Sequence, residues 1–389
     1  MCENLSVETS IVSACLQRSG IPERIEKECV LPRKEYAKRL VAASAVLCVA
    51  LVGGCRDSAG VTESGEDART SPPKIVLVRE IGEGTEGSFN ALAEEGLRDA
   101  EDDFDVEVRV MASSRPEQYA DNLKNGVKSG GDMLFTVGEW MMVPTTRTAA
   151  ENPDAIFAGI DQPYRTPGSN TVGLIFKEHE AAYLAGVVAG LSTLDLDLDR
   201  RINRKNVVGF IGGARVPLVE RYEAGFTAGV MSVNPTATVL SAYTNSFEDE
   251  ERGADICRTE IRRGADVILI AAGQSGLAVL DVAKDEGCLL IGVETDQSVT
   301  IPGASDVLLT SAMMRVDVVV YEAVERFLSG SLETGRNLEF GIAEDGVGLA
   351  PFHAFDDTIS RSTIQAVRRA QGDIASGTVV VPETMPELE

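Results

Sequence analysis

The sequence predicts an α/β protein with two lobes, each built on a doubly wound parallel sheet. Apolar, β-rich runs alternate with amphipathic helical patterns along the body, which is typical of a parallel sheet covered by helices on both faces. The chain has 389 residues, and about 330 remain once an N-terminal segment is removed, which is enough for two domains. Ten strand candidates suit two sheets better than one.

The N-terminus is predicted to be a targeting segment covering residues 1–55. Four basic residues between positions 33 and 39 precede an uncharged run from Leu40 to Val52, which is too short to span a bilayer and fits a signal-peptide core. The residues Val52-Gly53-Gly54-Cys55 resemble a bacterial lipoprotein box, in which the cysteine is acylated and begins the mature chain. An ordinary signal peptide beside an unrelated cysteine is the alternative, and residues 1–32 are expected to be an overextended gene start.

Residues 56–73 are expected to form a disordered tether, because they are polar and rich in glycine, serine and proline. A lipid on Cys55 would then hold a globular body at the extracytoplasmic face of the cell membrane. Two cysteines remain in that body, Cys257 and Cys288, which flank one predicted strand. They could pair, but two buried thiols are expected.

Composition excludes several classes of partner and site. The 61 acidic against 36 basic residues give a formal charge of −25, which repels phosphate backbones and makes nucleic-acid binding improbable. Only two histidines occur, His179 and His353, so there is almost no material for a Ser-His-Asp triad or a histidine zinc site. Both are expected to be structural, and no cofactor or metal is predicted.

Strand and helix patterns alternate along the body. The strand candidates are Lys74–Arg79, Val106–Met111, Asp132–Val137, Ile156–Ile160, Val172–Phe176, Val207–Ile211, Thr238–Tyr243, Val267–Ala271, Leu289–Val293 and Val307–Thr310. The helices between them are Phe89–Ala100, Pro116–Lys128, Glu178–Leu191, Val216–Val233, Glu250–Arg263, Gly276–Glu286 and Met313–Leu328. A helix over Thr358–Gln371 and a last strand at Thr378–Val381 are expected to return to the second lobe.

A literal G-x-G-x-x-G stands at Gly82–Gly87, between a strand and a helix, where a dinucleotide fingerprint would lie. However, Glu83 and Glu86 would sit beside the pyrophosphate. The second strand ends in Met111-Ala112-Ser113-Ser114, without the acidic residue that should hold the ribose. We therefore do not expect a nicotinamide site.

The residues Gly87-Ser88-Phe89-Asn90, followed by Gly96, resemble the D-K-S-F-N…G signature of the basic membrane protein family of solute-binding lipoproteins. Eight further motifs of that family follow in order: Phe157–Asp161, Glu180–Gly186, Val208–Gly213, Glu223–Val230, Asn245–Asp249, Ala272–Gly276, Ile291–Gln297 and Leu309–Ser311. The resemblance implies a type I periplasmic binding protein and not an enzyme. It also implies a purine nucleoside as ligand and the permease subunits of an ABC importer as partners.

Carried over by matching motifs, the family's site implies eight ligand-binding residues. Phe89 and Phe247, one from each lobe, would stack on the base. Ionised carboxylates only accept hydrogen bonds, so they complement ribose hydroxyls and purine N–H groups. The remaining contacts would come from Glu80, Asn90, Asp161, Gly273, Glu294 and Asp296.

One departure bears on the ligand. The family has a lysine three residues after its Thr-Ser, and in this sequence that position is Met314, with Arg315 one residue later. Because a helix turns about 100° per residue, Arg315 would not point the same way unless the register slips. A base-modified nucleoside or a different small solute is therefore an alternative.

The resemblance also implies three hinge crossings, near residues 176, 298 and 340. The first lobe would comprise residues 74–176 with 299–339, and the second 177–298 with 340–389. Ligand between the lobes would favour closure, which a permease would read. The alternatives are a nucleoside-processing enzyme on the same architecture, and a surface receptor that senses a solute for a partner protein.

Overall fold

The computed structural model describes residues 71–81 and 88–385. The predicted segment 1–55 with Cys55, almost all of the tether 56–73 and the Gly82–Gly87 motif lie outside these residues and stay predictions. The described residues belong to one compact unit. None of the helices in the described ranges is long and apolar enough to cross a membrane.

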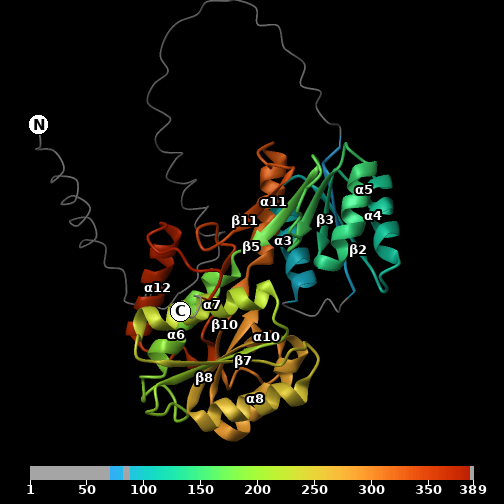
Figure 1. Cartoon of the computed structure of the whole chain (residues 1–389). Coiled ribbons are helices and arrows are strands. Elements are labelled where there is room, and N and C mark those ends of the chain that lie inside the picture. Colours follow the sequence, from blue (N-terminus) through green and yellow to red (C-terminus); the bar gives the residue numbers. More distant parts are fainter. Residues whose placement is uncertain (1–70, 82–87, 386–389) are drawn as a thin grey trace, which may run out of the picture. The chain divides into compact units, whose positions relative to one another are not determined.

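The first lobe is built on a six-stranded parallel sheet with the order β11-β5-β4-β3-β1-β2 (Figure 1). Its strands are β1 (Lys74–Arg79), β2 (Glu107–Ala112), β3 (Met133–Val137), β4 (Ile156–Ile160), β5 (Thr171–Phe176) and β11 (Arg336–Phe340). Every residue of the central strand β3 is buried, as a strand covered on both faces requires. The edge strand β2 has no fully buried residue.

The second lobe repeats this plan with the order β12-β10-β9-β8-β6-β7, in which only β12 runs antiparallel to its neighbour. Its strands are β6 (Val207–Gly212), β7 (Thr238–Tyr243), β8 (Ala265–Ala271), β9 (Leu289–Glu294), β10 (Leu308–Met314) and β12 (Val347–Leu349). All seven residues of β8 are buried. Both sheets therefore have the sandwiched strands that the continuous apolar runs predict.

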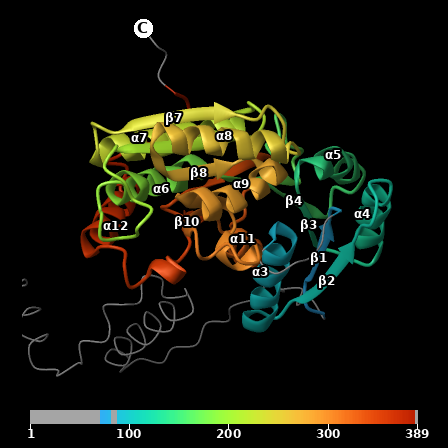
Figure 2. The same cartoon turned by 90° about the horizontal axis from the view of Figure 1, so that it is seen from below.

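Helices cover both faces of the first sheet. Its helices are α3 (Phe89–Asp103), α4 (Gln118–Lys128), α5 (Met142–Glu151) and α11 (Val316–Leu328). Helices α3 and α4 lie on opposite sides of β1 and β2 (Figure 2). Ile75 and Leu77 of β1 pack in the same core as α3, whereas Val76 and Val78 pack in a second core with Tyr119 of α4. This alternation follows from the two-residue period of a strand.

The second sheet is covered in the same way. Its helices are α6 (Glu178–Ser192), α7 (Pro217–Val233), α8 (Glu250–Arg263), α9 (Leu277–Val282), α10 (Gln297–Thr300) and α12 (Arg361–Ala375). Short helical turns lie at η2 (Glu139–Met141), η3 (Gly273–Gly276), η4 (Ala283–Gly287) and η5 (His353–Phe355). Helices α6 and α7 touch through glycine, since a Cβ on Gly186 or Gly229 would collide with the backbone of the other helix. Two of the family motifs, Glu180–Gly186 and Glu223–Val230, therefore have a packing role.

The chain crosses between the sheets three times. The first crossing lies at Lys177, between β5 and α6, and the third at residues 341–346, between β11 and β12. The crossing predicted near residue 298 was wrong. Because β10 pairs with β9 in the second sheet, the chain crosses at Arg315, and residues 299–314 belong to the second lobe.

Other differences from the sequence prediction lie at the edges of the fold. Strands β11 and β12 and helix α5 were not predicted, and residues 378–381 contain no strand. Edge strands carry a weak apolar signal, and β11 has a single buried residue, Phe340. Cys257 and Cys288 are free thiols in this structure, and both are fully buried.

Candidate functional site

The candidate site lies where the strands of both sheets end, the position at which open α/β sheets bind ligands. Glu80 follows β1, Asp161 follows β4, and Glu294 is the last residue of β9. Asp161 and Glu294 have φ values of 56° and 69°, in the left-handed region that residues other than glycine rarely adopt. Such strained conformations concentrate at functional sites, which supports both strand ends as parts of a ligand site.

Asp161 and Glu294 bring acidic side chains from opposite sheets toward each other. Glu294 is solvent-exposed although protein surrounds it, which is the environment of a cleft wall. Desolvation raises the pKa of Glu294, and the negative charge of Asp161 raises it further. Desolvation also raises the pKa of Asp161, whereas the positive charge of Arg221 opposes this. When ionised, the carboxylates of Asp161 and Glu294 are two hydrogen-bond acceptors that suit a ligand rich in donors.

Helix α7 supplies the cation of this region. Arg221 donates from Nε to Oε1 of Glu178, the first residue of α6, whose side chain is 2% exposed. Desolvation raises the pKa of Glu178 to about 7, even though Arg221 acts in the opposite direction. The neighbouring Tyr222 is fully buried, and its pKa is raised by desolvation and by the charges of Glu294 and Glu178. Sequence reasoning missed both residues.

The departure at Met314 is explained by the structure. Met314 lies in β10 with only 1% of its surface exposed, so it fills the core. Arg315 forms an ion pair with Asp345 at 2.5 Å, at the hinge crossing. Arg315 is therefore engaged at the hinge, and it is the positive charge of Arg221 that acts on Asp161.

Phe247 lies at the carboxyl edge of the second sheet and is 41% exposed. Its ring rests on the backbone, since a Cβ on Gly213 would lie 2.5 Å from Cδ1 of Phe247 and one on Gly273 would lie 3.3 Å from its Cβ. A pocket of about 110 Å³ is lined by Phe247, Gly273, Glu294 and Tyr222 together with other residues of this edge. Three of the predicted ligand-binding residues are thus brought together.

Phe89 and Asn90 open helix α3 in the first lobe. Ser88 caps this helix by accepting from the Ala91 N–H at 3.3 Å. The half-buried ring of Phe89 packs against Phe176, with ring centroids 6.4 Å apart. Asn90 is 6% exposed, and its side-chain oxygen has no hydrogen-bond partner among the described residues. A buried acceptor without a donor is unusual and fits a position that a ligand completes.

Asp296 differs from the other predicted ligand-binding residues. Its Oδ1 accepts from the Ser298 N–H at 3.2 Å and caps α10, and its Oδ2 lies 2.6 Å from Nε2 of His353. Both carboxylate oxygens are therefore engaged inside the second lobe. The structure gives Asp296 a role in positioning the loop after β9.

Comparison with known proteins relates the whole chain to a family. A family model described as ABC transporter substrate-binding protein PnrA-like matches residues 78–385. The CD4+ T-cell-stimulating antigen of Listeria innocua is 32% identical over 351 residues, which cover 86% of this chain and 94% of the relative. The ABC transporter nucleoside-binding protein BmpA of Lactococcus lactis is 28% identical over 365 residues, covering 89% and 99% of the two chains.

A solved structure matches the fold. The ABC transporter solute-binding protein from Conexibacter woesei superposes with a TM-score of 0.65 at 23% identity, covering 80% of this chain and 99% of that one. At this identity the likeness concerns the fold alone. It confirms the predicted two-lobed α/β architecture of periplasmic solute-binding proteins.

Proposed function

The chain belongs to the Bmp family of PnrA-like ABC transporter substrate-binding proteins, and from this premise we propose that it captures a purine nucleoside between its two lobes. Family membership makes it an extracytoplasmic binding component that delivers a small molecule to permease subunits. The relatives are substrate-binding proteins, so the alternative of a nucleoside-processing enzyme is set aside.

The observation that carries the nucleoside proposal is the approach of Asp161 and Glu294 from opposite lobes. The negative charge of Asp161 raises the pKa of Glu294, so the two carboxylates repel one another, and that repulsion disfavours closure of the empty cleft. The hydroxyl groups of a ribose can donate to both carboxylates and so offset the repulsion. The related BmpA of Lactococcus lactis, which is named as nucleoside-binding, supports this choice of ligand.

The base is proposed to lie between Phe89 and Phe247. These rings come from different lobes, and Phe247 is presented at the edge of its sheet by two glycines. Stacking of a base on an aromatic ring contributes about 1–3 kcal/mol. Asn90, Gly273 and Glu80 are proposed to contact the polar edges of the ligand.

Capture is proposed to work by population shift and involves no bond chemistry. A ligand that touches both lobes binds the closed form better than the open form, so it increases the closed population. The Arg221–Glu178 ion pair lies where the chain enters the second lobe, and it places a cation beside Asp161 of the first lobe. Closure is then the signal that a permease reads.

The membrane attachment is proposed to be a lipid on Cys55 followed by the tether 56–73. Acylation would make the protein partition with membranes, and Cys55→Ala should release it into the soluble fraction. Metabolic labelling with a radioactive fatty acid checks this directly. An unlabelled protein that still pellets with membranes would contradict the lipid anchor.

The nucleoside proposal is tested by calorimetry on protein freed of co-purified ligand by unfolding and refolding. Adenosine, guanosine and inosine should bind saturably, whereas cytidine, uridine and ribose should bind weakly or not at all. Glu294→Gln should weaken purine nucleoside binding, and Glu286→Gln, a change of the same kind outside the candidate site, should not. Silence toward every nucleoside would contradict the ligand while leaving the family membership intact.

A further inference from the structure

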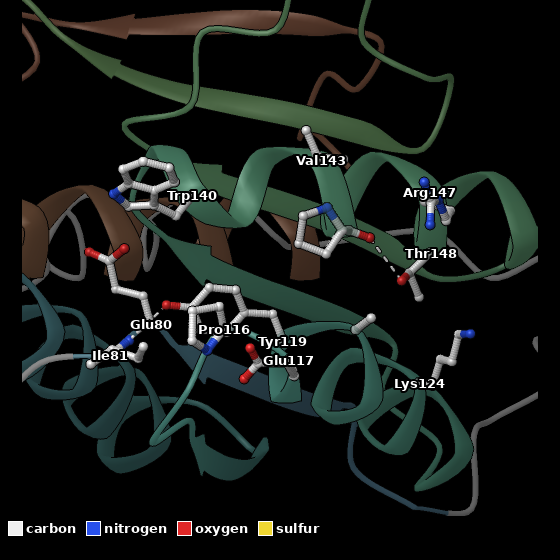
Figure 3. A pocket seen from close by; sticks show the side chains of 12 residues that line it. Glu80, Ile81, Pro116, Glu117, Tyr119, Lys124, Trp140, Val143, Arg147 and Thr148 are labelled. Atoms are coloured by element: carbon white, nitrogen blue, oxygen red, sulfur yellow. Dashed lines mark hydrogen bonds between the residues drawn. The ribbon is translucent and has the colours of Figure 1, made fainter.

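A second hollow lies in the first lobe and is separate from the pocket at Phe247. It is a groove of about 750 Å³ between α4 and α5, near the carboxyl edge of the sheet. Figure 3 shows Trp140 and Glu80 at one end, Tyr119 and Val143 along the walls, and Arg147 at the other end. Its volume is within the range of small-molecule sites, which is about 300–1,000 Å³.

The walls of this groove expose large apolar side chains to water. Trp140 is 81% exposed, Val143 65% and Ile81 46%. Trp140 is the only tryptophan of the chain, and it is the most exposed aromatic residue among those described. A contiguous apolar patch with charged groups at its ends is typical of a binding surface.

Glu80 joins the groove to the candidate ligand site. Its carboxyl group rests over Gly138, where an added Cβ would lie 2.5 Å from the carboxyl carbon and both oxygens. Gly138 also has a φ of 84°, so this seat is reserved for glycine. Within the described ranges no cation pairs with Glu80, and desolvation alone raises its pKa to about 7. Such a carboxyl group can accept from, or donate to, a ligand near neutral pH.

The spacing of the strand ends allows one molecule to contact both Asp161 and Glu80. In the sheet order β4-β3-β1, one strand separates the strand before Asp161 from the strand before Glu80. Adjacent strands lie about 4.8 Å apart, so these two ends lie roughly 10 Å apart. A nucleoside whose sugar contacts Asp161 can therefore present the far edge of its base to Glu80, at the entrance of the groove.

We propose that the groove binds an apolar substituent on the exocyclic amino group of the purine, with Glu80 accepting from the amino N–H and Trp140 covering the substituent. The ligand class is then an N-substituted aminopurine nucleoside, and this inference rests on the proposed function. The hydroxyl oxygen of Tyr119 accepts a hydrogen bond from the Ile81 N–H at 3.1 Å, which holds the Tyr119 ring against the groove. It therefore contributes a fixed apolar wall.

Calorimetry of the full chain with adenosine and with N6-benzyladenosine tests the proposal. The benzyl compound should bind about tenfold more tightly, because its ring leaves water for the groove. In Trp140→Ala this ratio of affinities should fall toward one. In Leu194→Ala, which removes a 54% exposed apolar side chain in the second lobe, the ratio should persist.

Fluorescence gives an independent readout because Trp140 is the single tryptophan. N6-benzyladenosine should shift the emission to shorter wavelength more than adenosine does. If adenosine binds but the benzyl compound binds no more tightly, the groove inference falls and the nucleoside function stands. If neither compound binds, both fall. If Trp140→Ala impairs uptake while the affinity ratio is unchanged, the groove contacts the permease and the inference is overturned.

Discussion

The carboxyl edges of the two sheets are built differently. In the second lobe, Phe247 lies on glycine backbone and the pocket beside it measures about 110 Å³. In the first lobe, Trp140 and Val143 stand in solvent beside a groove of about 750 Å³. In the second lobe the aromatic ring is thus supported by the protein itself, whereas in the first lobe the groove has room for ligands of different size. We infer that the second lobe sets the shared part of recognition and the first lobe adds selectivity.

The largest effect is expected from a carboxyl group sealed inside the second lobe. Glu260 of α8 is 2% exposed, and neither side-chain oxygen has a hydrogen-bond partner among the described residues. Desolvation raises its pKa from 4.5 to about 9. The folded state therefore keeps a proton that the unfolded chain releases, and stability is lost as the pH rises through this interval. Glu260→Gln should increase the free energy of unfolding at pH 8, on the order of several kcal/mol.

Denaturant titration at pH 5 and pH 8 checks this, because the gain from Glu260→Gln should be much smaller at pH 5. Glu80→Gln is the matched variant in the first lobe. Its wild-type carboxyl group is partly open to water and has a pKa of about 7, so the stability gain should be smaller. Equal gains in the free energy of unfolding for the two variants would contradict the contrast between a buried carboxyl group in the second lobe and a partly exposed one in the first.

The next effect concerns the two cations near the hinge. Arg221→Met leaves Glu178 buried without its partner and should lower the free energy of unfolding by about 2–3 kcal/mol. Arg315→Met breaks a pair whose Asp345 side chain is 55% exposed and should cost less than about 1 kcal/mol. Denaturant titration of both variants at one pH measures the difference. A greater loss in Arg315→Met would refute the central place given to Arg221.

Removing the ring of Phe247 should reduce ligand affinity more than it reduces the stability of the fold. Phe247→Ala should weaken purine nucleoside binding by roughly tenfold to a hundredfold, because one stacking face is lost. Phe89→Ala should weaken binding as well, but it also removes the contact with Phe176 and should lower the melting temperature. Calorimetry and thermal unfolding separate these outcomes. Unchanged affinity in both variants would exclude the stacked base.

The smallest effect is expected at Asp296. Since this carboxylate caps α10 and contacts His353, Asp296→Asn should cost about 0.5–1 kcal/mol of stability. Nucleoside affinity should change less than about threefold. A loss of affinity as large as that in Phe247→Ala would restore Asp296 to the ligand-binding set.

Local elements were predictable because the signals that define them are local. The bounds of β1, β4, β7 and α8 agree with those predicted from the sequence. Helix α8 shows the reason, since Asp249 caps its first turn and Gly264 ends it with a φ of 109°. The expectation that ligand-binding residues follow strand ends likewise needs only the strand positions. It placed Glu80, Asp161 and Glu294 at the carboxyl edges.

Long-range pairing decided what the sequence could not. The strand β10 could have joined either sheet by its composition, and its pairing with β9 moved a hinge crossing to Arg315. Arg221 became the cation of the site because α7 packs on α6 and brings it to Glu178, 43 residues away. The carboxylate of Asp296 is held by His353, 57 residues later in the chain. A sequence period states which face of an element is buried, but the partner that covers it exists only once the chain has folded.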